Sequence, residues 1–457
     1  MGALRLKAED GDQFEREVAA HYSARETIEN IPANTSVQST AGTVWDIPAP
    51  WNELLQTYAR HSDVAGAHIS VLRLMKGNPE AVASALMERA AQLRAGDVLA
   101  LEIGGKTRRF PDRMTREELG RALFLAGFEN TLVWAGRAVL IAETRHARVL
   151  GALLPSSALG AGELRIPGVS GRLIPPSDRI LCLARRSSLP KPAERRLKLS
   201  VVLPVYNERS TFCDLMERLL AKQMDGIDME ICLVESNSTD GTRDDVLSYR
   251  DEPRVRLLLE DKPSGKGHAV RKGLAMATGD IVLIQDADLE YDLDDYERLI
   301  APIRAGQASF VLGSRHSAEE GGGWRIRRFE GASQISDLLN LGHLFFTWFL
   351  NAIFMQRLRD PFTMYKVFRR DCIYAMRFEC NRFDFDHELV GKLVRNGFSP
   401  IELDVNYKSR SFDEGKKVSI LGDPPTWIRA CLKHRFSKLR DWPIAAPYIA
   451  SSSAGSD

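Results

Sequence analysis

Leu283-Ile284-Gln285-Asp286-Ala287-Asp288-Leu289-Glu290 begins as an apolar strand and ends as an acidic turn. Asp286 and Asp288 are one residue apart where the strand pattern breaks, so both carboxylates can converge on one point. Two carboxylates are costly to hold together unless a cation lies between them. Mg²⁺ and Mn²⁺ prefer such oxygen ligands and also bind diphosphates. The pattern predicts a metal and diphosphate site, and the alternative is a solvated acidic loop.

Apolar runs alternate with helical stretches on both sides of this turn. We expect strands at 199–203, 230–234, 255–259, 281–284 and 309–312. This alternation predicts an α/β fold with a mostly parallel, doubly wound sheet and right-handed crossovers. Ligands of such sheets bind outside the carboxyl ends of the strands, which is where the acidic turn is expected.

A series of motifs in this region carries a family resemblance. The motifs are VVLPVYNE (201–208), VESNSTDGT (234–242), SGKGHAVRKGLAMATGD (264–280), QDADLEYDLDDY (285–296), LGSR (312–315), DPFTMYKVFRR (360–370), FDFDHELVGKL (383–393) and YKSRSFDEGKK (407–417). In this order and spacing they resemble the family 2 glycosyltransferases of GT-A fold, in the branch of dolichol-phosphate mannosyltransferase and other polyprenyl-phosphate sugar transferases. The resemblance implies a Rossmann-like sheet with helices on both faces. It also implies an inverting hexosyl transfer from a UDP- or GDP-sugar.

The resemblance assigns residues to the sugar nucleotide. A base needs a flat apolar wall and a carboxylate that accepts its N–H groups, while a lysine among glycines suits a diphosphate. In one respect the chain departs from the family, because Glu235-Ser236 stands where the family usually has Asp-Asp. This departure leaves the choice between uracil and guanine open. The implied nucleotide-binding residues are Pro204, Tyr206, Glu208, Glu235, Lys266 and Asp286.

The resemblance also places the metal, Mg²⁺ or Mn²⁺, on Asp286 and Asp288, and it counts Asp288 as catalytic. Glu290 is either a third metal ligand or a surface carboxylate. An ordinary solvated lysine is the alternative for Lys266.

The acceptor side is basic. Arg315 follows the fifth expected strand, and Arg327 and Arg328 follow a glycine-rich stretch. Arginines suit a phosphate because the guanidinium offers a fork of donors. The resemblance supports Arg315 and one of the other two as ligands of an acceptor phosphate, and the alternative is a solvated basic loop. A second basic stretch contains Arg410, Lys416 and Lys417.

The acceptor decides whether a general base is needed. A lipid phosphate is already an anion, whereas a hydroxyl requires a carboxylate to take its proton. Asp386 and Glu388 stand where the wider family places an acidic catalytic pair. Their alternative role is to stabilise the N-terminus of a helix.

Residues 338–355 form the most apolar stretch. Its polar members Asn340, His343, Thr347 and Asn351 fall on one helical face, and the remaining arc is apolar and aromatic. With this polar stripe it is a poor transmembrane span. We expect either a helix in a membrane interface near a lipid acceptor or a core helix, with His343 satisfied inside the protein.

The first 189 residues precede the glycosyltransferase-like region. We expect a polar segment at 1–45, an α/β domain at 46–189, a linker at 190–196, the GT-A domain at 197–442 and a disordered tail at 443–457. Within 46–189 the pattern predicts helices at 51–60, 79–94 and 115–126 and strands at 98–103 and 139–142. It resembles the C-terminal half of a class I S-adenosylmethionine-dependent methyltransferase. The cofactor loop of that fold is missing, so we expect a degenerate domain that does not bind S-adenosylmethionine.

Composition bounds the remaining possibilities. The chain has 457 residues and a net charge of +1, which gives no reason to expect nucleic acid as a partner. Its six cysteines show no CxxC pair and are expected as reduced thiols in a cytoplasmic protein. The N-terminus has no apolar signal core, so any membrane contact is expected to be peripheral, on the cytoplasmic face.

Three hypotheses follow from the sequence. The first is metal-dependent sugar transfer to a polyprenyl phosphate, and the second is the same transfer to a soluble or protein hydroxyl. The third is a sugar-nucleotide-binding module with impaired catalysis, suggested by Glu235-Ser236.

Overall fold

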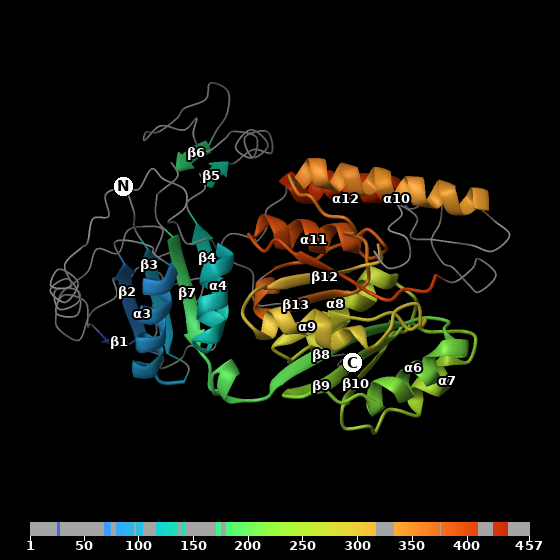
Figure 1. The fold of residues 1–457 in the computed structure, drawn as a ribbon, viewed down its shortest axis with the longest axis horizontal. Coiled ribbons are helices and arrows are strands. Elements are labelled where there is room, and N and C mark those ends of the chain that lie inside the picture. The colour runs from blue at the N-terminus through green and yellow to red at the C-terminus, as the bar shows by residue number, and fades with distance from the viewer. Residues whose placement is uncertain are drawn as a thin grey trace, which may run out of the picture. The chain divides into compact units, whose positions relative to one another are not determined.

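The computed structural model describes residues 25–27, 68–74, 79–95, 97–103, 116–135, 139–142, 171–174, 180–316, 333–374, 376–409 and 424–436. The chain separates into two compact units, residues 1–190 and 191–457. Each unit has its own sheet (Figure 1). The expected helix at 51–60 and the ends of the chain lie outside the described residues.

The first unit is built on a five-stranded sheet in the order β1-β2-β3-β7-β4. Strands β2 and β3 are parallel, and β7 is antiparallel to both β3 and β4. The strands are β1 (Arg25–Thr27), β2 (His68–Leu74), β3 (Val98–Ile103), β4 (Phe128–Ala135) and β7 (Ile180–Arg186).

Two helices, α3 (Pro79–Gln92) and α4 (Arg116–Leu125), supply much of the core of this unit. Val82, Leu86 and Ala90 recur every four residues along α3 and are buried together with Leu99 and Leu101 of β3. The expected helices at 79–94 and 115–126 and the strand at 98–103 are confirmed. The strand at 139–142 also forms, as β5 (Val139–Ala142), but it pairs with β6 (Gly171–Ile174) in a separate two-stranded sheet.

The second unit contains a seven-stranded sheet. Its strands are β8 (Leu197–Val205), β9 (Ile227–Glu235), β10 (Val255–Leu259), β11 (Ile281–Ile284), β12 (Phe310–Ser314), β13 (Lys366–Arg369) and β14 (Ile401–Asp404). They lie in the order β10-β9-β8-β11-β13-β12-β14. Neighbours from β10 to β11 are parallel, as are β12 and β14. Strand β13 runs antiparallel to both of its neighbours. The predicted α/β fold with a mostly parallel sheet is confirmed.

Helices pack against this sheet, and a group of helices lies together at one end of the unit (Figure 1). Helix α8 contacts β8 and β9, and α9 contacts β12 and β13. Helices α10 and α12 lie side by side, and both contact α11. The helices of this unit are α6 (Arg209–Ala221), α7 (Thr242–Leu247), α8 (Lys266–Met276), α9 (Asp295–Arg304), α10 (Ser333–Phe354), α11 (Phe385–Arg395) and α12 (Pro424–Phe436). Among the helices described, none has the length and apolar content that crossing a bilayer requires.

Helix α8 approaches the sheet closely because of a glycine. A Cβ atom on Gly273 would lie 2.5 Å from Cγ1 of Val202 in β8. The glycine therefore lets α8, whose first residue is Lys266, pack closely on β8.

The end of the expected linker is tied to the second unit. Arg195 forms an ion pair with Asp280 at 2.5 Å, and Arg196 pairs with Asp228 at 2.6 Å. Both contacts lie close to the start of β8, so they fix the point where the chain enters the sheet. The six cysteines all lie within the described residues and form no disulfide with one another.

The buried carboxylate of Glu230 in β9 stabilises the end of the sheet at which β8 and β11 begin. It accepts hydrogen bonds from Ser200 Oγ at 2.5 Å and Thr278 N at 2.7 Å. It also pairs with Lys198 Nζ at 2.7 Å. Burial alone would raise the pKa of Glu230, but these donors outweigh burial and lower it from 4.5 to about 2. The lowered pKa means that the ionised form stabilises the fold above pH 4.5 and that this contribution is lost as the pH falls toward 2.

We predict that Glu230→Gln destabilises the full chain at pH 7 by about 3 kcal/mol, because the charge-assisted hydrogen bonds are lost. The difference between this variant and the parent should shrink as the pH falls below 4.5. Denaturant midpoints measured at several pH values would test it. Glu217→Gln, at an exposed position of α6, serves as the control and should leave the midpoint unchanged. A pH-independent cost at Glu230 would contradict the prediction.

Candidate active site

The candidate site lies at the carboxyl ends of β8, β9, β10 and β11. Val205 is paired with Glu235, and Glu235 with Leu259, so these three strands end at the same level. Because neighbouring strands are parallel, the loops that follow them meet at one edge of the sheet. Pro204, Tyr206, Glu235 and the acidic turn after Ile284 therefore share this edge, as the sequence predicts.

The acidic turn, residues 285–290, is held in an uncommon backbone conformation. Leu289 has a φ of 57°, a left-handed conformation that branched and bulky side chains adopt at a cost. The amide of Glu290 donates to Asp288 Oδ1 at 3.2 Å, and the hydroxyl of Thr211 donates to the carbonyl of Ala287 at 2.7 Å. These bonds fix the turn so that its carboxylates are presented from a defined backbone.

Lys266 is the cation of this site. It is the first residue of α8, and its Nζ lies 2.7 Å from Asp286. Burial disfavours the charged ammonium, but Asp286, Asp386 and Asp288 outweigh burial and raise the pKa of Lys266. Lys266 thus stays charged and offsets part of the negative charge of three carboxylates.

The chemical type of the donors in the acidic turn suits a hard divalent cation. Asp286, Asp288 and Glu290 offer carboxylate oxygens from a single turn, which is the ligand type that Mg²⁺ and Mn²⁺ prefer. The Asp286 side chain is 16% exposed, so it is partly accessible from solvent. A cation bound here would share Asp286 with the ammonium of Lys266.

Glu235 has internal partners. Its side chain is fully buried, Oε1 accepts from the amide of Ser238 at 2.6 Å, and Oε2 lies 3.0 Å from Arg243. This arrangement orders the loop after β9. The loop after β9 is also bound to the loop after β8. Asn207 N donates to Ser238 Oγ at 2.9 Å, and Glu208 N donates to Thr242 Oγ1 at 3.0 Å.

The sequence analysis missed a second carboxylate at this end of the sheet. Glu260 directly follows β10 and is buried. It accepts from the Ser236 hydroxyl at 2.7 Å and lies 2.5 Å from Nδ1 of His268. Ser236, the second residue of the pair Glu235-Ser236 found in place of the expected Asp-Asp, therefore contacts a carboxylate supplied by the residue that follows β10. The sequence did contain a signal for this carboxylate, because an acidic residue directly follows the expected strand at 255–259.

Asp386 and Glu388 lie in different environments. Asp386 accepts from Lys366 Nζ at 2.8 Å and acts on the charge of Lys266, so it belongs to the candidate site. Glu388 is fully buried, pairs with Lys392 at 2.6 Å and accepts from the amide of Cys380 at 2.7 Å. Neighbouring positions on a helix point in different directions, which explains the separation. Glu388 lies in a network that anchors the loop before α11.

Lys366, which the sequence analysis did not select, is a second cation of the site. It is fully buried in β13. Burial lowers its pKa, Asp386 opposes this shift, and the neighbouring cations Lys266 and Arg315 add to it. Two lysines and two aspartates, from four different segments, therefore compensate one another's charge.

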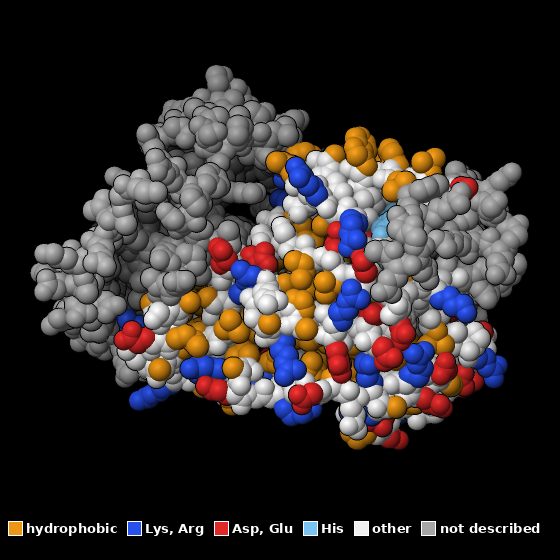
Figure 2. Space-filling view, viewed as in Figure 1, with side chains coloured by type: hydrophobic (Ala, Val, Ile, Leu, Met, Phe, Trp, Pro, Cys, Tyr) orange, Lys and Arg blue, Asp and Glu red, His pale blue; other side chains and the backbone are white. Residues whose placement is uncertain are grey.

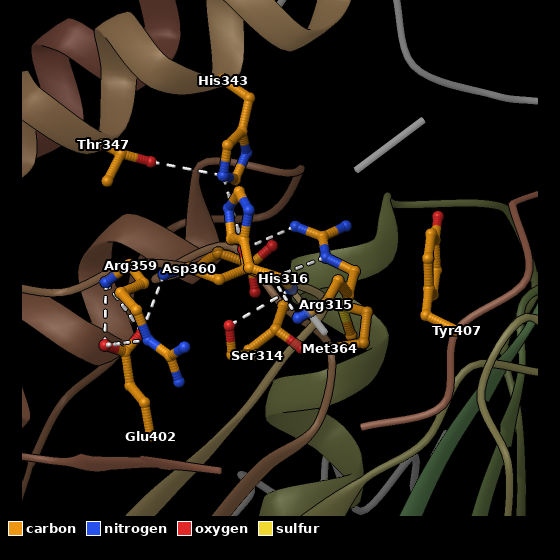
Figure 3. Close-up of polar contacts among 12 residues, drawn as sticks. Ser314, Arg315, His316, His343, Thr347, Arg359, Asp360, Met364, Glu402 and Tyr407 are labelled. Carbon is orange, nitrogen blue, oxygen red and sulfur yellow. Dashed lines mark hydrogen bonds and ion pairs between the residues drawn. The ribbon is translucent and has the colours of Figure 1, made fainter. Parts of the chain in front are cut away.

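Arg315 has a partner that the sequence did not predict (Figure 3). Its guanidinium binds Asp360 through Nε at 2.8 Å and Nη2 at 2.7 Å, and its amide donates to the same carboxylate at 3.0 Å. The Arg315 side chain is only 6% exposed. Burial would raise the pKa of Asp360, but Arg315 holds it well below its ordinary value. Arg327, Arg328, Arg410, Lys416 and Lys417 lie outside the described residues.

Helix α10 is one-sided, as predicted, but its polar side faces the protein. Asn340, His343 and Thr347 are buried. His343 lies 3.6 Å from Asp360 and 3.4 Å from the Thr347 hydroxyl, so the expectation that it is internally satisfied is confirmed. Part of the apolar arc also faces inward, and the rest is exposed at the end of the unit (Figure 2). The exposed large apolar residues here are Leu341, Leu344, Phe345 and Trp348 of α10, and Met355, which directly follows the helix.

Comparison with known proteins places this site in context. Residues 200–376 match the model of Glycosyl transferase family 2. The chain is 28% identical over 222 residues to undecaprenyl-phosphate 4-deoxy-4-formamido-L-arabinose transferase of Enterobacter sp. (strain 638), covering 48% of this chain and 62% of the relative. It is 31% identical over 120 residues to dolichol-phosphate mannosyltransferase of Pyrococcus furiosus, covering 26% and 34%. The chain thus spans less than two thirds of either relative.

Solved structures of similar fold include glucosyl-3-phosphoglycerate synthase of M. tuberculosis, at 19% identity and a TM-score of 0.38, covering 52% of this chain and 80% of that one. The same enzyme has been solved in complex with Mn²⁺, uridine diphosphate and glucosyl-3-phosphoglycerate.

We predict that Arg315→Met lowers the stability of the protein by about 3–5 kcal/mol, because it leaves Asp360 buried without its partner. Adding Asp360→Asn to this variant should restore part of the loss, since the uncompensated charge is removed. Denaturant midpoints of the two variants and the parent would measure this. An unchanged midpoint in Arg315→Met would mean that the ion pair contributes little to stability. In that case the guanidinium of the parent protein could bind a phosphate at little cost.

Proposed function

We propose that this chain, whose residues 200–376 form a Glycosyl transferase family 2 domain, is an inverting, metal-dependent glycosyltransferase that uses a nucleoside diphosphate sugar. The observation that carries the proposal is the meeting of Asp286, Lys266 and Asp386 at the carboxyl edge of the sheet. Charges of both signs on a partly accessible edge suit a ligand that is itself an anion bound with a cation. The donor is a UDP- or GDP-sugar.

Asp286 and Asp288 would hold the metal, with Glu290 as a third ligand. When bound, Mg²⁺ or Mn²⁺ offsets the charge that develops on the leaving diphosphate. Lys266 supplies a fixed positive charge beside Asp286 at the start of α8, where backbone N–H groups also favour a phosphate. Pro204, Tyr206, Glu208 and Glu235 lie at or next to the ends of β8 and β9 and would border the base. The contacts of Glu235 favour a role in shaping the loop around the base.

We propose a polyprenyl phosphate as the acceptor. Its phosphate oxygen attacks the anomeric carbon of the sugar, and the bond to the nucleoside diphosphate breaks with its electron pair leaving on that group. No proton has to be removed from such an acceptor, so no strong base is needed. Two relatives are named for transfer to or from lipid phosphates, which supports this choice.

The exposed apolar face of α10 supports the same acceptor. Trp348 is 64% exposed and Met355 is 76% exposed, an uncommon exposure for large apolar side chains. The neighbouring helix α12 adds exposed Arg429 and Lys433, of which Lys433 is also ion-paired with Glu379. An apolar face with adjacent cations suits the interface of a membrane with anionic lipids. We propose peripheral contact with a membrane, on its cytoplasmic face.

A hydroxyl acceptor is the second candidate function. Asp386 favours it, because this carboxylate shares the site with Lys266 and would accept the proton of the hydroxyl. The ion pair with Lys366 opposes it, since this carboxylate already has an ammonium partner. Under the third hypothesis, a binding module, the nucleotide would bind without transfer.

We predict that Asp286→Asn with Asp288→Asn weakens Mn²⁺-dependent binding of UDP or GDP by at least about 10–100-fold, the loss that even indirect damage to a metal site typically causes. The shape of the turn is kept, so the change isolates its charge. Calorimetric titrations with and without Mn²⁺ would measure the effect. Asp294→Asn, whose side chain is 86% exposed, is the control. Unchanged Mn²⁺-dependent affinity in the double variant would refute the metal assignment.

We also predict that Phe345→Ser with Trp348→Ser lowers binding to vesicles of phosphatidylcholine and phosphatidylglycerol about tenfold or more, because two apolar side chains no longer enter the interface. Nucleotide binding should be retained. Leu189→Ser, a change at another exposed apolar position, should leave vesicle binding intact. Transfer to a soluble alcohol as fast as to a polyprenyl phosphate in vesicles would favour the hydroxyl acceptor, with Asp386 as the base.

A further inference from the structure

A short segment after β14 runs along the acidic turn. Tyr407 forms an antiparallel bridge with Tyr291. The amide of Lys408 donates to the carbonyl of Glu290 at 2.8 Å, and the amide of Asp292 donates to the carbonyl of Asn406 at 3.3 Å. Residues 406–408 therefore lie directly beside residues 290–292, although more than a hundred residues separate them along the chain.

Tyr407 also contacts the side chain of Glu290. Its hydroxyl donates to Glu290 Oε2 at 2.8 Å. Glu290 is thus held twice, through its carbonyl by Lys408 and through its carboxylate by Tyr407. This contact is next to Leu289, whose left-handed backbone persists only if the surrounding structure determines it.

The ring of Tyr407 is itself fixed on two sides. Its centroid lies 5.1 Å from that of Tyr291 and 5.4 Å from the guanidinium carbon of Arg315. Figure 3 shows this ring beside the Arg315 side chain, which is bound to Asp360. Asp360 in turn lies close to His343 of α10. Contacts therefore run from α10 through Asp360 and Arg315 to the Tyr407 hydroxyl and Glu290.

We propose that Tyr407 is a positioning residue of the donor site, which orients the carboxylate of Glu290 for the metal ion. The inference rests on the proposed function, since it requires that the acidic turn binds a divalent cation. A glutamate side chain has several rotatable bonds, and a hydroxyl that binds one oxygen restricts them before the cation arrives. Arg315, the residue predicted to bind the acceptor phosphate, also contacts the ring and so supports the position of Tyr407.

Tyr407→Phe tests this role because it removes the hydroxyl and keeps the ring. We expect about a tenfold loss of Mn²⁺ affinity in the presence of UDP or GDP, measured by electron paramagnetic resonance of free Mn²⁺. At saturating Mn²⁺, kcat should stay within about twofold of the parent, whereas a general structural defect would lower it. Tyr365→Phe is the matched control, because its hydroxyl donates to the carbonyl of Asp292 at 2.9 Å in the same neighbourhood.

A second variant, Glu290→Gln, separates the possible outcomes. It should lower Mn²⁺ affinity, and adding Tyr407→Phe to it should cause little further loss, because the two residues act as one unit. Equal Mn²⁺ affinity in Tyr407→Phe and the parent would overturn the proposal. If Glu290→Gln were also silent while the Asp286 and Asp288 variant lost binding, the role of Tyr407 would fail and the proposed function would stand. If none of these variants changed Mn²⁺ binding, the proposed metal-dependent function itself would be refuted.

Discussion

The structure of the second unit depends on one electrostatic constraint, the crowding of carboxylates at the carboxyl edge of its sheet. Asp286, Asp288 and Asp386 come from two segments, and their mutual repulsion would oppose folding if nothing offset it. Lys266 from α8 and Lys366 from β13 meet Asp286 and Asp386 at 2.7 Å and 2.8 Å. The close packing of α8 on β8 and the antiparallel insertion of β13 are therefore also the means by which two cations reach this edge.

A second buried ion pair, Arg315 with Asp360, borders the candidate site. Arg315 and Asp360 satisfy each other almost completely, and Glu402 of β14 accepts the amide of Asp360 at 2.7 Å. A buried pair of this kind seldom increases stability over apolar packing, but removing one member is costly, so it fixes a unique arrangement. Here the arrangement joins the ends of β12 and β14 to α10. The same pair explains why the polar stripe of α10 faces inward, since His343 lies beside Asp360.

Much of the fold could be predicted from the sequence, because apolar runs of strand length and the helices between them are local signals. The five expected strands of the second unit all form, within a few residues at their ends. Strands β13 and β14, of four residues each, were not predicted. In β13 all four residues are buried and show no alternation. The acidic turn and Lys266 were predicted from their neighbours in sequence. The partner of Arg315 was not, because Asp360 is distant along the chain and no local pattern connects the two. Periodicity identified the two faces of α10, but only tertiary contacts decide which face is buried.

Ser236 is another case in which the local sequence and the tertiary contacts give different information. In sequence, Glu235-Ser236 looks like the loss of one carboxylate from the nucleotide-binding edge. In the structure, Ser236 donates to Glu260, so a carboxylate is still present at this end of the sheet but is supplied by β10. Glu260 is also next to His268, two residues beyond Lys266 on α8. The edge therefore has a buried carboxylate beside Ser236, supplied by the residue that follows β10. The ion pairs of Asp286 with Lys266 and of Asp386 with Lys366 are made in other segments, so Glu235-Ser236 is not by itself an argument for impaired catalysis.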